Sequence, residues 1–167
     1  MPRVLPMVVV FVASALSGCA TGPRFDAGEY DRHVTPAQTV AEGQKAVGTR
    51  VLWGGMIINT NNLPQGTEVE ILAYPLAPSQ RPDIDKAPLG RFIASSSEYL
   101  ESVDYAQGRM ITLAGPITGT REGKIGETHY VYPVLEPEAG HIYLWPIGSA
   151  RRTEPRFSIG VGVLFGR

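Results

Sequence analysis

The sequence predicts an all-β domain, a single barrel or sandwich of about six to seven strands preceded by one short helix. Two observations predict this class. From Val51 onward, apolar residues recur at every second position in short runs, and Gly, Pro and polar turns separate these runs. Only one stretch, near Thr35, carries helix signals. The loops are uneven in length, so no internal repeat is predicted, and 167 residues suit one domain.

The first 18 residues are predicted to be a signal peptide. Arg3 supplies a basic tip, residues 4–16 are apolar, and the small residues Ser17 and Gly18 follow. This run is shorter than the ~20 residues of a membrane-spanning helix. Removal of residues 1–18 would leave a chain that begins at Cys19.

Cys19 is the only cysteine. Together with Leu16, Ser17 and Gly18 it resembles the lipobox of bacterial lipoproteins. That resemblance implies an S-diacylglycerol and an N-acyl group on Cys19. The alternative is an incidental or buried thiol. Several acyl chains, at about 0.8 kcal/mol per buried methylene, give a firm anchor. The residue after the cysteine is Ala20 rather than aspartate, and by the sorting rule of that protein class this favours the outer membrane, with the domain in the periplasm.

The charge balance argues against nucleic-acid binding. The chain has 15 basic and 16 acidic residues, and loss of Arg3 leaves 14 against 16. A net charge of about −2 provides no basic footprint.

The N-terminal part of the mature chain is predicted to be a tether followed by a helix. Residues 19–34 mix Gly, Pro and charges without periodicity. Thr35, Pro36 and Gln38 then form a capping signature, and Gly48 ends a predicted helix over residues 36–47. Its expected buried positions are Ala37, Val40, Ala41, Gln44 and Val47. The single β domain is assigned to residues 35–167.

The predicted strands follow in order. A strand from Val51 is expected to bulge at Gly54-Gly55, and a polar turn is expected over residues 59–66. The proline-rich residues 75–88 read as a loop and residues 120–124 as a turn. The further expected strands cover residues 67–74, 89–94, 109–119, 125–135, 141–145 and 157–165.

The last of these strands alternates without interruption. Its large side chains share one face and are Phe157, Ile159, Val161, Val163 and Phe165. We predict that it pairs within the sheet of the domain. Pairing with a second protomer and assembly into a membrane-spanning barrel are the alternatives.

Several segments resemble the Slp-type outer-membrane lipoproteins, which are starvation-inducible envelope proteins of Gram-negative bacteria. The matching runs are VLWGGMIINTNN, TEVEILAYPL, GRFIA, DYAQGRMITLAG, GKIGETHYVYPVL and HIYLW. This resemblance covers roughly residues 51–145 and implies a small OB-like antiparallel barrel. It implies no established enzyme activity, no cofactor and no catalytic residues.

Two groups of side chains are candidate sites. Glu127, His129 and His141 suggest a loose metal site or an acid–base pair, but a half-exposed polar sheet face explains them better, and no metal or cofactor is predicted. Five aromatic residues could form a ligand face, although barrel cores contain the same pattern, and the core interpretation is favoured. They are Trp53, Tyr130, Tyr132, Tyr143 and Trp145.

A basic cluster precedes the last strand and consists of Arg151, Arg152 and Arg156. It is interpreted as a solvated loop, with contact to anionic lipid as the alternative.

The sequence thus favours a non-enzymatic outer-membrane lipoprotein with a structural or interaction role, anchored by lipid, with an envelope protein or glycan as partner. The alternatives are a ligand-binding barrel for a glycan, peptide or lipid, and a membrane-tethered metal-dependent hydrolase.

Overall fold

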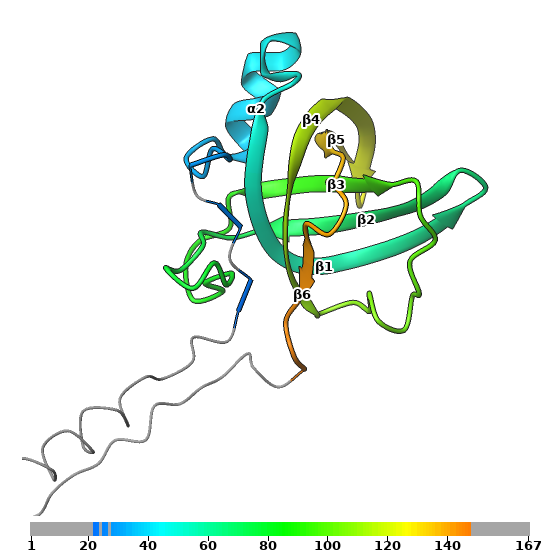
Figure 1. Ribbon diagram of the computed structural model, residues 1–167. Coiled ribbons are helices and arrows are strands. Elements are labelled where there is room, and N and C mark those ends of the chain that lie inside the picture. The colour runs from blue at the N-terminus through cyan, green and yellow to red at the C-terminus, as the bar shows by residue number, and fades with distance from the viewer. Residues whose placement is uncertain (1–21, 24, 27, 148–167) are drawn as a thin grey trace, which may run out of the picture.

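A computed structural model describes residues 22–23, 25–26 and 28–147 (Figure 1). Its elements are one short helix with a 3-10 turn and six strands, so the predicted mostly-β class is confirmed. The helical elements are α2 (Pro36–Glu42) and η2 (Gly43–Ala46). The strands are β1 (Arg50–Leu63), β2 (Gly66–Ala73), β3 (Gly90–Ser96), β4 (Met110–Ile125), β5 (Thr128–Leu135) and β6 (Ile142–Leu144).

The strand pairings close a ring. β1 pairs with β2 and with β4, β2 pairs with β3, β3 pairs with β5, and β5 returns to β4. Closure is possible because the two longest strands, β1 and β4, each pair with two different strands along their length. The first half of β1 pairs with β4 and its second half with β2, while β4 pairs first with β1 and then with β5. The β3–β5 pairing is parallel, so the expectation of a wholly antiparallel sheet is wrong at this one place.

The expected bulge at Gly54-Gly55 is wrong. Both glycines stay in register with β4, and the irregularity lies instead between Ile57 and Asn59. The glycine pair reflects crowding, because a Cβ atom on Gly55 would lie 2.0 Å from the carbonyl oxygen of Leu72. Here β1 is paired on both sides, so neighbouring backbone leaves no room for a side chain.

Two expected turns are shorter than the sequence suggested. β1 continues through the polar residues 59–62 to Leu63, and β4 continues through residues 120–124 to Ile125. Cross-strand pairing keeps these polar residues extended, with Asn59 opposite Glu70 and Arg121 opposite Tyr132. The β4–β5 reversal occurs at Gly126, which has a φ of 58°.

The hydrophobic core is built from the alternating buried positions of the strands. Its largest fully buried side chains include Phe92, Ile57, Ile71, Leu113 and Leu135. Trp53 lies in the same cluster and packs edge-on against Phe92, with ring centroids 5.0 Å apart. The period-two pattern therefore identified this core correctly.

The helix begins as predicted and ends earlier. Thr35 and Gln38 form the expected capping box. The predicted buried stripe is wrong, because α2 turns the face with Pro36 and Thr39 inward and the chain tightens into η2 only from Gly43. Ala37, Ala41, Gln44 and Val47 are exposed and Val40 is half-buried. The buried residues are Pro36, Thr39 and Ala46.

Four predicted features lie outside the described residues: the signal peptide over residues 1–18, Cys19, the basic cluster of Arg151, Arg152 and Arg156, and the strand over residues 157–165. Within the described part of the chain, no helix has the length and apolar character needed to cross a membrane.

Candidate functional site

Several described residues of the segment that follows Cys19 contact the sheet and its loops. Gly22 lies beside Trp145, where an added Cβ atom would meet the indole ring at 3.3 Å. Asp31 forms a parallel bridge with Val51. Its N–H donates to the Arg50 carbonyl at 2.8 Å, and its own carbonyl accepts from Leu52 N–H at 3.0 Å. This bridge covers the start of β1 on the side that β2 leaves unpaired.

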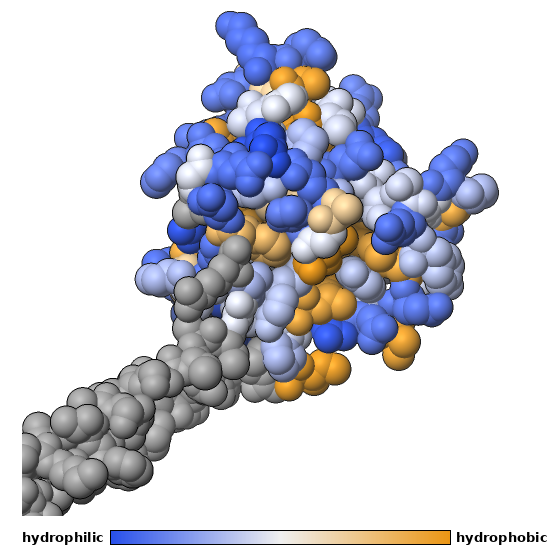
Figure 2. Space-filling model, viewed as in Figure 1, coloured by the Kyte–Doolittle hydropathy of each residue, from blue (hydrophilic) through white to orange (hydrophobic). Residues whose placement is uncertain are grey.

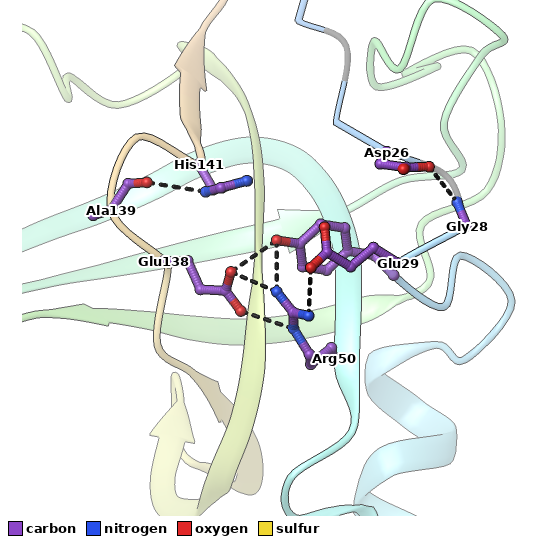
Figure 3. A network of polar contacts seen from close by, with 8 residues as sticks. Asp26, Gly28, Glu29, Arg50, Glu138, Ala139 and His141 are labelled. Atoms are coloured by element: carbon purple, nitrogen blue, oxygen red, sulfur yellow. Dashed lines mark hydrogen bonds and ion pairs between the residues drawn. The ribbon is translucent and has the colours of Figure 1, made fainter.

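A polar cluster fixes the middle of this segment (Figure 3). Arg50 binds Glu138 through two parallel hydrogen bonds of 2.9 and 2.6 Å. It also donates to Glu29 at 2.6 Å and to the Tyr30 hydroxyl at 3.0 Å. The Tyr30 hydroxyl in turn donates to Glu138 at 2.8 Å. Arg50 of β1 thus joins the N-terminal segment to the loop before β6, in the bidentate geometry that suits guanidinium and carboxylate.

These contacts shift the pKa values of the cluster. Hydrogen bonds from Arg50, and then from Tyr30, lower the pKa of Glu138. Burial, followed by the hydrogen bond to Glu138, raises the pKa of Tyr30. Hydrogen bonds to Glu138 and Glu29 raise the pKa of Arg50. At neutral pH Arg50 and Glu138 are therefore held charged and Tyr30 is held as the neutral phenol.

A second polar chain fixes the segment nearer to Cys19. The side-chain amide of Gln80 accepts from Phe25 N–H at 3.0 Å and donates to the Phe25 carbonyl at 2.7 Å. Gln80 is only 7% exposed and has a φ of 64°. Its own carbonyl accepts from the Thr112 hydroxyl, and Thr112 accepts from the Trp145 indole N–H at 2.9 Å. Buried hydrogen bonds therefore connect Phe25 to the start of β4 and to the end of β6.

Apolar contacts complete the attachment. Tyr30 is 3% exposed and packs with Leu52 and Ala114, and Phe25 joins the same small cluster. His141 stacks on Phe25, with ring centroids 5.6 Å apart.

We call this set the N-terminal docking site. It comprises Phe25, Tyr30, Arg50, Gln80, Thr112, Glu138 and Trp145. The sequence pattern predicts a tether over residues 19–34, and within its described part Gly22, Phe25 and Tyr30 contact the domain. The charged groups of the site bind one another, and the arrangement positions a chain segment.

The five aromatic residues of the predicted ligand face lie in three separate places. Trp53 is in the core and donates to the Val34 carbonyl at 2.7 Å. Tyr130 and Tyr132 form an edge-on pair on β5, and Tyr143 and Trp145 form another at β6. The structure brings each pair together but does not assemble the five on one face.

A shallow groove of about 200 Å³ lies between the β1–β2 and β4–β5 hairpins. The buried residues Tyr132 and Ile93 are among those that line it. Its charges are paired across strands: Arg121 binds Glu68, and the neighbouring Arg91 binds Glu70 at 2.6 Å. The groove is therefore polar, and most of its charged side chains are paired with other side chains of the protein.

The residues weighed as a metal site are not brought together. His129 lies opposite Lys124 and 3.6 Å from Glu122. The His141 carbonyl accepts from the N–H of Ala114, which lies ten positions before Lys124 on β4. The Nδ1 atom of His141 is 3.0 Å from the Ala139 carbonyl. Within the described residues, no cluster of three or more His, Cys, Asp or Glu has the arrangement of a metal site.

Sequence reasoning missed the docking site because its members are far apart in the chain. Gln80 is 55 residues from Phe25, and Glu138 is 108 residues from Tyr30. No local spacing connects such residues. The only local signal is the pair of aromatic residues Phe25 and Tyr30 in a segment of mostly small and polar residues.

Comparison with known proteins gives a consistent result. The profile of the outer membrane lipoprotein Slp family matches residues 16–161. An uncharacterized lipoprotein YeaY of Escherichia coli is 34% identical over 128 residues, which cover 74% of this chain and 64% of that protein. An uncharacterized protein of Haemophilus influenzae is 30% identical over 77% of this chain and 70% of its own length.

The outer membrane protein Slp of Escherichia coli is 27% identical over 87% of this chain and 77% of its own length. The chain thus spans just under two thirds of the YeaY lipoprotein and more of the other two relatives. No solved structure matches. The match to most of the chain means that this protein belongs to the outer membrane lipoprotein Slp family.

Proposed function

We propose that this protein is anchored in the outer membrane by acyl groups on Cys19 and presents a small barrel to the periplasm, where it has a structural or interaction role in the envelope rather than a catalytic one. One observation carries the proposal. The segment after Cys19 is fixed to the domain by the N-terminal docking site, instead of connecting anchor and domain through a long flexible tether. Such a connection suits a protein that holds its domain in a defined place at the membrane.

The use of charge in the site supports a positioning role. Arg50 and Glu138 form hydrogen bonds with each other and with the N-terminal segment, so these charged groups have their partners within the protein. Membership of an outer membrane lipoprotein family supports the location, and the lipobox at residues 16–19 supports Cys19 as the acylated residue.

The ring is also proposed to be an OB-like barrel. In an OB-fold, five strands close a Greek-key barrel, and the face of strands 2 and 3, with the β1–β2 and β4–β5 loops, binds ligands. Here five strands close in the order β1-β2-β3-β5-β4, with β6 added outside.

Replacement of Cys19 tests the anchor. We expect Cys19→Ala to give an unprocessed and unacylated chain that is absent from the outer-membrane fraction. The matched control is Ser17→Ala, which keeps a small residue before the cleavage site and should be processed normally. The measurements are the intact mass of the purified chain and its distribution on a density gradient of cell membranes. Normal processing of Cys19→Ala, with outer-membrane location retained, would contradict the proposal.

A ligand-binding function is the second candidate, because the groove between the two hairpins occupies the position in which OB-folds bind ligands. Soluble peptidoglycan fragments are a suitable probe, since they combine glycan and charged peptide. Binding there should perturb the amide resonance of Gly123 in NMR spectra and should be weakened by Arg121→Ala. Unchanged spectra at millimolar fragment would count against this function.

The metal-dependent hydrolase has the least support, because His129 on β5 and His141 before β6 lie opposite β4 positions that are ten residues apart, Lys124 and Ala114. We expect a chelator to leave the melting temperature unchanged. A fall in the melting temperature of more than a few degrees would support the metal-dependent hydrolase.

A further inference from the structure

The length of chain between Cys19 and the docked segment limits how far the domain can stand from the membrane. Only Ala20 and Thr21 lie between Cys19 and Gly22, which is packed beside Trp145. Three residue steps span at most about 11 Å when fully extended. A membrane that holds acyl groups on Cys19 must therefore lie close to the end of the domain that carries Trp145.

That end of the domain is apolar and lies below β6 in Figure 1. Residues 106–110 and 145–147 line a mostly apolar hollow of about 230 Å³ there. Ile147 is 85% exposed, the most exposed large hydrophobic side chain among the described residues. Figure 2 shows hydrophobic side chains reaching this end of the molecule. Val103, which is 79% exposed, precedes Asp104 in the adjoining loop, and Arg109 binds the carbonyl of Asp104.

Two arginines lie near Trp145, one at its indole ring and one at its backbone carbonyl. The guanidinium of Arg81 lies 5.8 Å from the centre of the Trp145 ring. Arg109 donates to the Trp145 carbonyl at 3.4 Å and also pairs with Asp104 at 3.7 Å. Trp145 itself is only 5% exposed, so it supports this end from inside the domain. Arginine side chains next to the exposed aliphatic Ile147 and Val103 suit the boundary between lipid headgroups and acyl chains.

We infer that this end of the domain, where Arg81, Arg109, Val103 and Ile147 surround the buried Trp145, rests on the phospholipid surface that holds the anchor of the same chain. The inference deepens the proposed function and depends on acylation of Cys19. It adds a defined orientation: α2 points away from the membrane, and the groove between the hairpins remains open to the periplasm.

The orientation also follows from the fold. Val47, just after η2, marks the opposite end, because Gly48 bonds to Ile117 on β4 while the Trp145 N–H bonds to Met110. These two β4 residues are seven positions apart, about 23 Å of extended strand. The two ends of the domain are thus well separated along β4, as Figure 1 also shows.

The test uses the full mature lipidated chain in vesicles of phosphatidylethanolamine and phosphatidylglycerol that contain a headgroup nitroxide lipid. Because Cys19 is the only cysteine, Ile147→Cys introduces one thiol for a fluorescent label. Val47→Cys is the matched control, since Val47 is also an exposed aliphatic residue, 37% exposed. Both replacements are on the surface and should leave the fold intact.

We expect the nitroxide to quench the label at position 147 several-fold more than the label at position 47. Equal quenching, or stronger quenching at position 47, would overturn the orientation while leaving the anchor intact. The mass of the N-terminal peptide from the same samples separates the two claims. A chain without acyl groups would overturn both the proposed function and this inference.

Discussion

The side-chain amide of Gln80 makes two hydrogen bonds to the backbone of Phe25, which lies 55 residues earlier in the chain. The pair resembles one step of an antiparallel ladder, with a side chain in place of a strand. The backbone of Gln80 is in the left-handed conformation, and its side-chain amide lies against the backbone of Phe25. A turn with a positive φ and a buried amide thus hold the segment that follows the proposed lipidation site, and this relationship predicts how the proposed anchor is coupled to the domain.

Loss of the Gln80 amide should release the N-terminal segment. Gln80→Gly keeps the left-handed conformation accessible and removes both hydrogen bonds. We expect the free energy of unfolding to fall by about 1–3 kcal/mol, because Phe25 loses two partners and a cavity forms. Trypsin should also cleave faster after Arg24 in the folded variant.

The matched control is Ser79→Gly, which introduces the same residue at the exposed neighbouring position. It should leave the rate of cleavage after Arg24 close to that of the parent. Identical cleavage rates for Gln80→Gly and the parent would show that the amide does not hold the segment.

The Arg50–Glu138 contact should make stability depend on acidity. Because hydrogen bonds from Arg50 and Tyr30 lower the pKa of Glu138 in the folded state, its carboxylate stabilises the fold above the ordinary glutamate range, about 4.3. That contribution is lost as the pH falls through the lowered folded pKa. Glu138→Gln should therefore lower the melting temperature by a few degrees at neutral pH, and the difference from the parent should disappear in acid.

Glu136→Gln is the control, because Glu136 is an exposed glutamate two residues away, and its replacement makes the same charge change. Melting curves between about pH 7 and about pH 3 give the comparison. A Glu138→Gln deficit that stays constant over this range would contradict the assigned role of the charge.

The Tyr30 hydroxyl should act together with Glu138. Tyr30→Phe removes its donation to Glu138 and its acceptance from Arg50. Because the ring stays packed against Leu52 and Ala114, we expect a loss of about 0.5–1.5 kcal/mol in the free energy of unfolding. In a double-mutant cycle with Glu138→Gln, the combined loss should be smaller than the sum of the two single losses. Additive losses in urea unfolding would show that the two groups act independently.

Alkaline pH gives a second readout of the same hydroxyl. The pKa of Tyr30 is raised in the folded state, so the neutral phenol stabilises the fold below about pH 10. This stabilisation is lost as the pH rises through the raised pKa. We therefore expect the difference in melting temperature between the parent and Tyr30→Phe to narrow in alkali.

Much of the fold could be predicted because it depends on local alternation. The buried residues Val69, Ile71 and Ala73 of β2 were read directly from the period-two pattern, and the Thr35–Gln38 capping box was read from four consecutive residues. Polar strand residues were harder to assign. Thr120 to Lys124 look like a turn in isolation, and only their pairing with β5 keeps them extended.

The docking site could not be predicted, for a different physical reason. Arg50 can bind Glu138 because closure of the ring places the start of β1 next to the loop before β6. The parallel β3–β5 contact arises in the same way, from the return of the chain after β4. Such pairings are properties of the closed sheet, so a single sequence carries no local signal for them.

The closure of the ring at Gly55 gives the sharpest prediction for stability. A Cβ atom there would lie 2.0 Å from the Leu72 carbonyl oxygen and 2.8 Å from the Ile71 side chain. The first contact is with backbone that is hydrogen-bonded in the β1–β2 ladder, so relief requires the strands to separate. We expect Gly55→Ala to cost about 3 kcal/mol or more in the free energy of unfolding, or to prevent folding.

Gly119→Ala is the matched control, because Gly119 is also in a strand and a Cβ atom there would meet nothing within 4 Å. That replacement should be neutral or slightly stabilising, since alanine reduces the freedom of the unfolded chain. Urea unfolding of the two variants, monitored by Trp53 and Trp145 fluorescence, gives the comparison. If Gly55→Ala were as stable as Gly119→Ala, β1 could not be tightly paired on both sides at Gly55, and the ring would have to be open there.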